Sequence, residues 1–212
     1  GKLGGAERRR VTTAFRPDIV VLQKTRHPLN RAECFDGLPF VLDVDDADFL
    51  DPALSDLMAR TARAAAGVIA GSRFVAEWAR QHNAHTEIVW TGSDPSGEGR
   101  RPQAERRARL AWAISKASGY DAEFDFVTDM LLRTARRAPA PLLFRQYGWD
   151  LPDDHANIRK LRAAGVDVAF VRGMLPYPAF LRSLEDVAVG LAPLSPDAPY
   201  SQGKSFGKIL GY

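Results

Sequence analysis

The stretch Gly203-Lys204-Ser205 carries residue types that hold phosphate groups in many proteins. At the start of a helix, its backbone N–H groups and the positive end of the helix dipole would attract an anion, and the Lys204 ammonium would add a full charge. Lys208 follows one helical turn later and would face the same anion. The motif therefore predicts a phosphate site, and a helix start with a purely structural role is the alternative.

A nucleoside-triphosphate-binding loop is another interpretation of the same motif. That loop needs a glycine five positions before Gly203, and the sequence has Ala198 there. It also needs a strand that leads straight into the loop, which is disfavoured by Pro193, Pro196 and Pro199. Triphosphate binding is therefore not favoured.

Further candidate residues follow the predicted strands of the second half of the chain. In a doubly wound sheet, ligands bind beyond the carboxyl ends of the strands, where loops lead into helices. By that rule the informative loops are residues 115–119, 145–148, 172–174 and 201–205. Several of these loops carry a cation or a glycine, which suits them to an anionic ligand.

The acidic sequence Asp43-Val44-Asp45-Asp46 follows a predicted strand and is a second candidate site. It could hold Mg²⁺ or Mn²⁺ on a nucleotide diphosphate, because hard cations prefer carboxylate oxygens. The alternative is a cluster that edges an interdomain cleft or caps the helix after Asp51. His27, just past a strand end, would be either an acceptor-side general base or an exposed loop histidine.

Composition excludes several classes of protein. The 212 residues are 45% hydrophobic and 26% charged, which is typical of a globular chain with one large or two small domains. The net charge of +3 is too small and too local to favour nucleic-acid binding. A single cysteine, Cys34, is incompatible with an internal disulfide or a multi-cysteine metal site, and it favours a reducing cytoplasm. No apolar run approaches the ~20 residues of a membrane-spanning helix.

The elements that must position these residues alternate between strands and helices. In the first half, short apolar runs predict strands at residues 18–23, 39–43, 68–70 and 87–90. Asp51 followed by Pro52 predicts a helix start, because a proline at the first helical position loses no hydrogen bond, and Gly67 is expected to end that helix. A second helix runs through Phe74 and Trp78. This alternation predicts a parallel sheet covered on both faces.

Residues 91–107 interrupt the pattern with prolines, glycines and clustered charge, which predict a linker or mobile loop. The alternation then resumes, with strands at 110–114, 141–145, 166–171 and 187–191, and helices at 121–137, 156–164 and 180–184. We therefore predict an α/β protein with two doubly wound parallel-sheet domains, residues 1–93 and 108–212, joined by residues 94–107. Both domains are expected to be incomplete, the second at its C-terminus.

Near the end of the chain, LEDVAVGLAPLSPDAPYSQGKSFGKILGY joins a predicted strand to the Gly-Lys-Ser helix. This stretch resembles the nucleotide-sugar-binding domain of GT-B glycosyltransferases, particularly the family 4, group 1 type. GVIAGSRFVAEWARQHNAHTEIVWTGSDP is similar to the end of the N-terminal domain in that family, and FVLDVDDADF to an acidic stretch of the same enzymes. The resemblance covers residues 17–212 and implies two Rossmann-like domains of GT-B type.

The resemblance implies a role for each matching position. Residues 172–174 would lie by the base of the donor nucleotide, and residues 115–116 in the loop where such enzymes place cations against the diphosphate. Donor-binding residues would thus be Ser115, Lys116, Arg145, Arg172, Gly173, Met174, Gly203, Lys204, Ser205 and Lys208. Lys204, Lys208 and His27 would be the catalytic candidates. The acceptor would enter near His27, Asp43, Asp45 and Asp46.

Two features depart from the family pattern. The second glutamate of the family's Glu-x7-Glu motif would fall on Gly211, which has no side chain to accept hydrogen bonds from a ribose. Complete GT-B enzymes are also longer than this chain. We therefore expect the chain to lack the opening strand and glycine-rich loop of the first domain and the helices that would follow Tyr212.

From these observations we expect a hexosyltransferase-like enzyme of bacterial type. It would move a sugar from a nucleoside-diphosphate sugar to a glycosyl acceptor with retention of anomeric configuration, because family 4 enzymes retain it. Lysine side chains and a helix N-terminus would stabilise the leaving diphosphate without an obligatory metal or other cofactor. We expect a cytoplasmic protein without a nucleic-acid partner. The alternatives are a non-catalytic sugar-nucleotide or protein-binding module of the same fold, and a metal-dependent transferase using the Asp43–Asp46 cluster.

Overall fold

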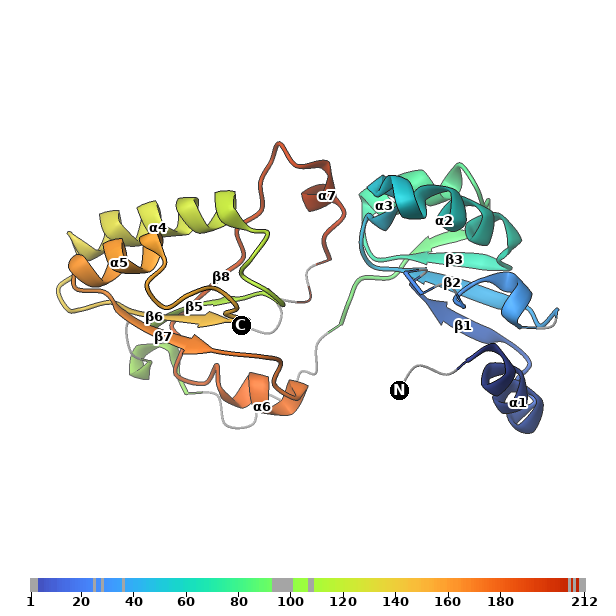
Figure 1. Ribbon diagram of the computed structural model, residues 1–212, viewed down its shortest axis with the longest axis horizontal. Helices are drawn as coiled ribbons and strands as arrows, with labels where there is room; N and C mark the ends of the chain where they lie inside the picture. Colours follow the sequence, from blue (N-terminus) through green and yellow to red (C-terminus); the bar gives the residue numbers. More distant parts are fainter. Residues whose placement is uncertain are drawn as a thin grey trace. The chain divides into compact units, whose positions relative to one another are not determined.

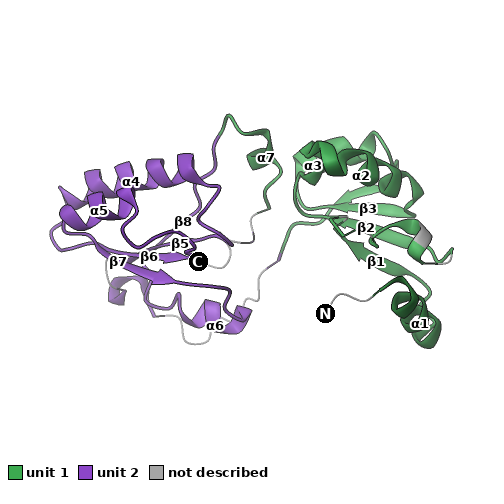
Figure 2. Cartoon of the chain, viewed as in Figure 1, with its two compact units in different colours: residues 1–91, 196–206 green, residues 92–195, 207–212 purple. Residues whose placement is uncertain are grey.

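The computed structural model describes residues 4–24, 26–27, 29–35, 37–92, 101–106, 109–205, 207 and 209. The chain divides into two compact units, shown in Figure 2. The first unit comprises Gly1–Thr91 with Pro196–Phe206, and the second comprises Gly92–Ser195 with Gly207–Tyr212. The sequence analysis placed all of residues 108–212 in one domain. In the structure, the described residues 196–205 group with the first unit by their contacts.

The described part of the first unit contains a four-stranded parallel sheet with the order β1-β2-β3-β4 (Figure 1). Leu22 is the partner of Leu42, and Leu42 is the partner of Val68, so these side chains form one row on the same face. All three are buried, whereas Val21 on the opposite face is 62% exposed. The core of this unit therefore lies on one face of its sheet, and the prediction of a sheet covered on both faces is wrong for the described part of this unit. The strands are β1 (Val20–Gln23), β2 (Phe40–Val44), β3 (Gly67–Ala70) and β4 (Thr86–Ile88).

The core face is covered by α2 (Pro52–Ala64) and α3 (Arg73–Arg80), as Figure 1 shows. The predicted start of α2 is confirmed, because the Asp51 side chain accepts a hydrogen bond from the Ala53 N–H at 2.9 Å. Ser72 caps α3 in the same way through the Val75 N–H. The remaining elements of this unit are α1 (Gly5–Phe15), α7 (Pro199–Gln202) and the 3₁₀ turns η1 (Ala32–Cys34) and η2 (Asp48–Leu50).

The described part of the second unit contains a four-stranded parallel sheet with the order β7-β6-β5-β8. Helices α4 (Asp121–Ala135) and α5 (Ala156–Ala163) cover one face, and α6 (Tyr177–Arg182) lies on the other (Figure 1). Trp112, Phe124 and Phe144 belong to the larger core under α4 and α5. The strands are β5 (Arg109–Ala113), β6 (Leu143–Tyr147), β7 (Asp167–Val171) and β8 (Val189–Leu191), and η3 (Gln103–Glu105) precedes them.

The predicted strands occur in the predicted order with α2 to α6 between them, whereas α1 and α7 were not predicted. β6 begins at Leu143 instead of residue 141, so Arg145 lies inside the strand instead of at its carboxyl end. α2 ends at Ala64, and Gly67, which we predicted to end that helix, opens β3. Strand β4 ends at Ile88, before Trp90. Among the described residues, no helix has both the length and the apolar sequence needed to cross a membrane.

Candidate functional site

The second sheet changes its direction of growth at β5. From β5 the chain moves outward through β6 and β7, and it then returns to place β8 on the other side of β5. Because the strands are parallel, the loops after β5 and β8 leave the same edge of the sheet and then diverge. Such a topological switch point is where open α/β sheets bind ligands. Ser115 and Lys116 follow β5 after one intervening residue, Ile114, and therefore lie at this point, as predicted.

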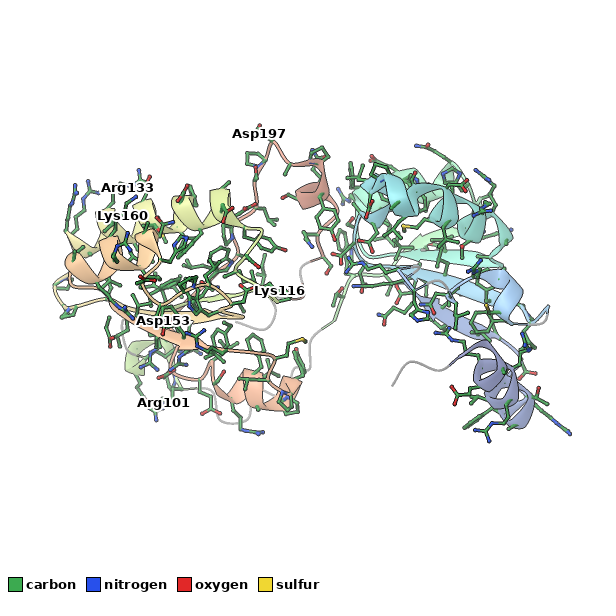
Figure 3. All side chains as sticks on the ribbon, in the orientation of Figure 1. Arg101, Lys116, Arg133, Asp153, Lys160 and Asp197 are labelled. Carbon is green, nitrogen blue, oxygen red and sulfur yellow. The ribbon has the colours of Figure 1, made fainter. Side chains whose placement is uncertain are left out.

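Lys116 is an exposed cation that makes no hydrogen bond or ion pair with any residue the structure describes. Figure 3 shows it apart from Arg133 and Lys160, which extend from α4 and α5. The first turn of α4 carries the carboxylates of Asp121 and Glu123, which offset the positive end of its helix dipole. In the loop after β5, the positive charge for an anion therefore comes from the Lys116 side chain and not from the N-terminus of α4.

The loop that carries Lys116 is tied to the end of β6. The Ala117 N–H donates to the Gly148 carbonyl at 3.0 Å. The Ser118 hydroxyl and the Ser118 N–H both donate to the Asp150 carboxylate. These bonds, of which the hydroxyl's has the larger effect, hold the pKa of Asp150 below its ordinary value. Gly148 has a φ of +72°, and a Cβ there would overlap the Ile114 carbonyl. Only glycine allows this close approach, which fixes the backbone beside Lys116.

Three of the other predicted donor residues of this unit, Arg172, Gly173 and Met174, follow β7, which is separated from β5 by β6. Arg172 follows β7, where it pairs with Asp153 and lies 5.8 Å from the centre of the Phe170 ring. Gly173 has a φ of +69°, and the Met174 side chain is 87% exposed. All of these residues lie at the carboxyl edge of the sheet, but they follow β7 and not the strands at the switch point.

Arg145 faces a different part of the second unit. Within the sheet it is the partner of Ala111, and its Nη1 donates to the Ser183 carbonyl at 2.5 Å and to Asp186 at 3.3 Å. Its side chain lines an open groove of about 630 Å³, together with Arg101, Tyr147, Val171, Arg182, Ser183, Glu185 and Asp186. The difference from the prediction follows from the two-residue shift of β6.

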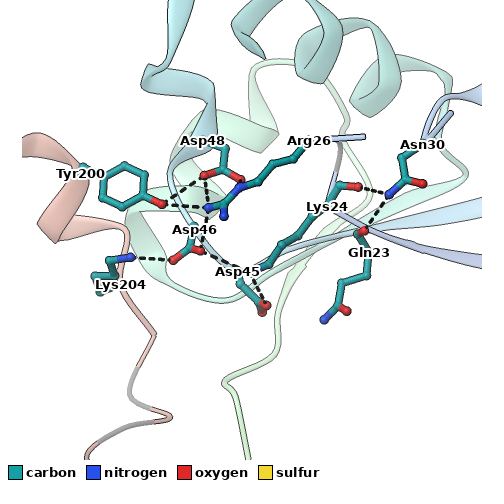
Figure 4. Close-up of polar contacts among 9 residues, drawn as sticks. All are labelled: Gln23, Lys24, Arg26, Asn30, Asp45, Asp46, Asp48, Tyr200 and Lys204. Atoms are coloured by element: carbon teal, nitrogen blue, oxygen red, sulfur yellow. Dashed lines mark hydrogen bonds and ion pairs between the residues drawn. The ribbon is translucent and has the colours of Figure 1, made fainter. Parts of the chain in front are cut away.

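In the first unit, charged side chains gather where the loops after β1 and β2 meet Pro196–Phe206 (Figure 4). Asp46 accepts hydrogen bonds from Lys24 Nζ at 3.2 Å, Arg26 Nη2 at 3.1 Å and Lys204 Nζ at 3.0 Å. We call this group the Asp46 cluster, which comprises Lys24, Arg26, Asp45, Asp46, Asp48, Tyr200 and Lys204. Burial acts to raise the pKa of Asp46, but Lys204 and Lys24 outweigh it and hold that pKa below its ordinary value.

Asp48 and Tyr200 fix the orientation of Arg26 within the cluster. The Arg26 guanidinium donates to both carboxylate oxygens of Asp48, each at 2.5 Å. The Tyr200 hydroxyl donates to Asp48 at 3.1 Å and accepts from Arg26 at 3.0 Å. Burial, followed by the neighbouring carboxylates, raises the pKa of Tyr200, so its hydroxyl stays protonated as a donor. This geometry links the loop after β1 to α7.

The Gly-Lys-Ser motif has a different local structure from the predicted helix start. It follows α7, whose C-cap is Gly203. The Gly203 and Lys204 N–H groups donate to the carbonyls of Tyr200 and Ser201, so they are not free for an anion. Gly203 is buried, and a Cβ there would lie 2.5 Å from the Ala47 Cβ. Ser205 is half-buried; Lys208 and Gly211 lie outside the described residues.

The acidic residues expected on the acceptor side are mostly paired with cations. The Asp45 Oδ2 atom lies 3.5 Å from Lys24 Nζ. The pKa of Asp43 is raised, first by burial and then by the negative charge of Asp45. His27 is half-buried in the loop after β1, where its Nδ1 accepts from the Leu29 N–H at 3.1 Å. No group of three His, Cys, Asp or Glu side chains among the described residues is arranged to hold a metal ion.

Sequence reasoning missed the partners of Asp46: Lys24, Arg26 and Tyr200 were not among the candidates. A signal for the first two was present, because they directly follow a predicted strand that is parallel to the strand before the acidic stretch. The carboxyl ends of neighbouring parallel strands meet at one edge, so opposite charges after them are expected to pair. Nothing local predicts that Tyr200 and Lys204 join them.

The low pKa of Asp46 predicts a pH dependence for the first unit. A carboxyl group whose folded pKa is lowered from 3.8 stabilises the fold above that value, and the contribution is lost as the pH falls through the folded pKa. Urea unfolding should therefore show Asp46→Asn to be less stable than the wild type at pH 7. The difference in the free energy of unfolding between the two proteins should shrink as the pH falls below about 3.8. A gap that stays constant from pH 7 to pH 2 would contradict this prediction.

Comparisons with known proteins identify the fold. No protein-family model matches the chain, and no curated protein matches it. The structure is similar to that of TarM, with a TM-score of 0.56 and 12% identity over 90% of this chain and 40% of that chain. It is similar to Staphylococcus aureus MnaA in complex with UDP, with a TM-score of 0.51 and 12% identity. A third similar structure is the UDP-N-acetylglucosamine 2-epimerase from Rickettsia bellii, with a TM-score of 0.50 and 9% identity.

These likenesses show a GT-B-like fold built from two α/β units with parallel sheets. The chain spans 40% of the length of the TarM chain and 54% of the MnaA and epimerase chains. The matches to MnaA and to the epimerase each cover 88% of this chain. Membership of family 4 stays a prediction.

Proposed function

We propose that this protein is a glycosyltransferase that moves a sugar from a nucleoside-diphosphate sugar to an acceptor, with retention of configuration and without an obligatory metal. The observation that carries the proposal is the position of Lys116 at the switch point of a parallel sheet in a GT-B-like fold, where it has no hydrogen-bond or ion-pair partner among the described residues. The cytoplasmic location remains a prediction of the sequence.

The chemistry requires stabilisation of a leaving group. The bond between the sugar's anomeric carbon and the diphosphate breaks, and a bond from an acceptor hydroxyl to that carbon forms on the same face of the sugar. The hydroxyl proton passes to a general base on the acceptor side of the site or to the departing nucleoside diphosphate. We propose that Lys116 stabilises the charge on the diphosphate, a role that we also propose for Lys204 and Lys208. Arg172, Gly173 and Met174 are our proposal for the base of the nucleotide.

UDP is the first nucleotide to test. The S. aureus MnaA structure contains UDP, and the R. bellii enzyme is named for a UDP-sugar. These proteins share the fold with this chain, and their ligands supply a starting hypothesis for it.

A calorimetric titration tests the proposal. The chain is titrated with UDP, GDP and ADP, each with and without a chelator. We expect one of them to bind with a micromolar dissociation constant that the chelator does not change. Binding that disappears in chelator would favour the metal-dependent alternative. The absence of binding to any of the nucleotides would overturn the donor site. Binding without turnover of any UDP-sugar would favour a non-catalytic sugar-nucleotide-binding module.

A further inference from the structure

We propose that Lys24, Arg26 and Lys204 form a phosphoryl-binding site in the first unit, which the Asp46 carboxylate occupies in this structure. The ligand would be the phosphate group of a small molecule. The inference shares Lys204 with the proposed function, but Lys24 and Arg26 extend it to residues that the donor assignment does not use.

The first observation is the convergence of cations on one carboxylate. Lys24 Nζ, Arg26 Nη2 and Lys204 Nζ lie 3.2, 3.1 and 3.0 Å from the oxygens of Asp46 (Figure 4). A phosphoryl group presents oxygens of the same kind and attracts the same donors, because ammonium and guanidinium groups form their strongest hydrogen bonds with anionic oxygens. The Asp46 carboxylate thus marks the position that a phosphoryl oxygen would take.

The second observation is the backbone conformation of Lys24. Lys24 has a φ of +58°, in the left-handed region that non-glycine residues rarely adopt. The conformation is held by its N–H, which donates to the Asp43 carbonyl at 3.1 Å, and by Asn30, whose side chain donates to the Lys24 carbonyl at 2.6 Å. Strain of this kind persists where surrounding contacts enforce it, and it concentrates at ligand sites. The strained residue, Lys24, is thus one whose ammonium group donates to Asp46.

The third observation distinguishes Asp46 from its neighbour Asp48. Among the described residues, the Asp46 side chain is bonded to cations alone, whereas Asp48 is also bonded to the Tyr200 hydroxyl. Asp48 and Tyr200 therefore hold Arg26 in place whether or not Asp46 stays. The Lys24, Arg26 and Lys204 side chains are 33%, 50% and 25% exposed, so a solute can reach them. Asp46 is thus the carboxylate that an incoming phosphoryl group would replace.

The charge balance of the cluster supplies the test. The positive charges of Lys24, Arg26 and Lys204 are balanced by Asp45, Asp46 and Asp48. The substitution Asp46→Asn removes one of the three carboxylates that compete for these cations, and it keeps the size of the side chain. A phosphoryl group should then bind without first displacing an internal anion.

The experiment is a calorimetric titration with pyrophosphate on the full chain, comparing the wild type with Asp46→Asn. We expect the variant to bind about tenfold more tightly, the effect of one charged hydrogen bond that no longer competes. Asp45→Asn is the matched control, since it makes the same change of charge in the adjacent residue, which pairs with Lys24 alone among the described residues. It should change the affinity less than threefold, about the effect of an exposed ion pair.

Further variants keep the proposal falsifiable. The gain of Asp46→Asn should disappear in the Asp46→Asn, Lys204→Ala double variant. In the wild-type background, Lys24→Gln should weaken pyrophosphate binding about tenfold, which tests the site even if Asp46→Asn fails to fold. An Asp46→Asn variant that binds no more tightly than Asp45→Asn, or a Lys24→Gln variant with wild-type affinity, would overturn the proposal.

The source of the phosphoryl group is resolved by repeating the titrations with UDP and inorganic phosphate. If UDP gains affinity from Asp46→Asn as pyrophosphate does, the site takes the donor diphosphate. If inorganic phosphate gains and UDP does not, it takes a separate phosphate, such as one carried by the acceptor. A pyrophosphate gain together with no UDP binding in any variant would refute the proposed function and leave this inference intact.

Discussion

Replacing Gly148 with alanine is expected to lower the free energy of unfolding of the second unit by about 3 kcal/mol, the sum of two costs. The first is the left-handed backbone at a φ of +72°, which costs a residue with a Cβ about 1–2 kcal/mol. The second is steric, because the added Cβ would overlap the Ile114 carbonyl oxygen and lie 2.9 Å from the Ser115 carbonyl carbon. Relieving such overlap by a backbone shift costs about 1–3 kcal/mol.

Chemical denaturation of the full chain measures this effect, and Gly173→Ala is the matched control. Gly173 has nearly the same backbone conformation, with a φ of +69°, but nothing lies within 4 Å of the position its Cβ would take. The control should therefore show only the conformational cost. Equal destabilisation by the two substitutions would mean that the loop of Lys116 does not pack against Gly148 as the structure has it.

Lys116→Ala is expected to weaken nucleoside-diphosphate binding by 1.5–3 kcal/mol, roughly 10- to 150-fold, the value of a hydrogen bond to a charged group. In the structure, Lys116 makes no ion pair with the described residues, so its removal breaks no internal contact there and the fold should keep its stability. Loss of affinity with unchanged unfolding would therefore report on the ligand. The measurement is the UDP titration, with a urea unfolding curve for each variant.

Lys160→Ala provides the control for overall charge. Lys160 is exposed on α5, away from Lys116 in Figure 3, and its removal changes the net charge by the same amount. We expect it to leave UDP affinity within about twofold, because salt screens the attraction between an exposed charge and a ligand that it does not contact. If both lysines matter equally, the nucleotide is attracted by the general field of the protein and the switch-point site is wrong.

The amino-acid sequence by itself predicted the order of strands and helices, the parallel sheets and the start of α2. These features depend on neighbours in the chain. The Asp51-Pro52 pair acts within one turn of helix, and the strands are short runs that consist mostly of apolar residues. The position of Lys116 after a strand of the second sheet was predictable for the same reason.

Only the tertiary structure decided the environment of the predicted site residues. A two-residue shift of β6 placed Arg145 in the sheet beside Asp186, and a short helix before Gly203 took up the N–H groups expected to bind phosphate. The Lys204 ammonium donates a hydrogen bond to Asp46, which lies 158 residues away in the sequence. Such pairings depend on strand register and on close backbone approach, as at Gly203 against Ala47, and these are properties of the packed chain that no local pattern of residues encodes.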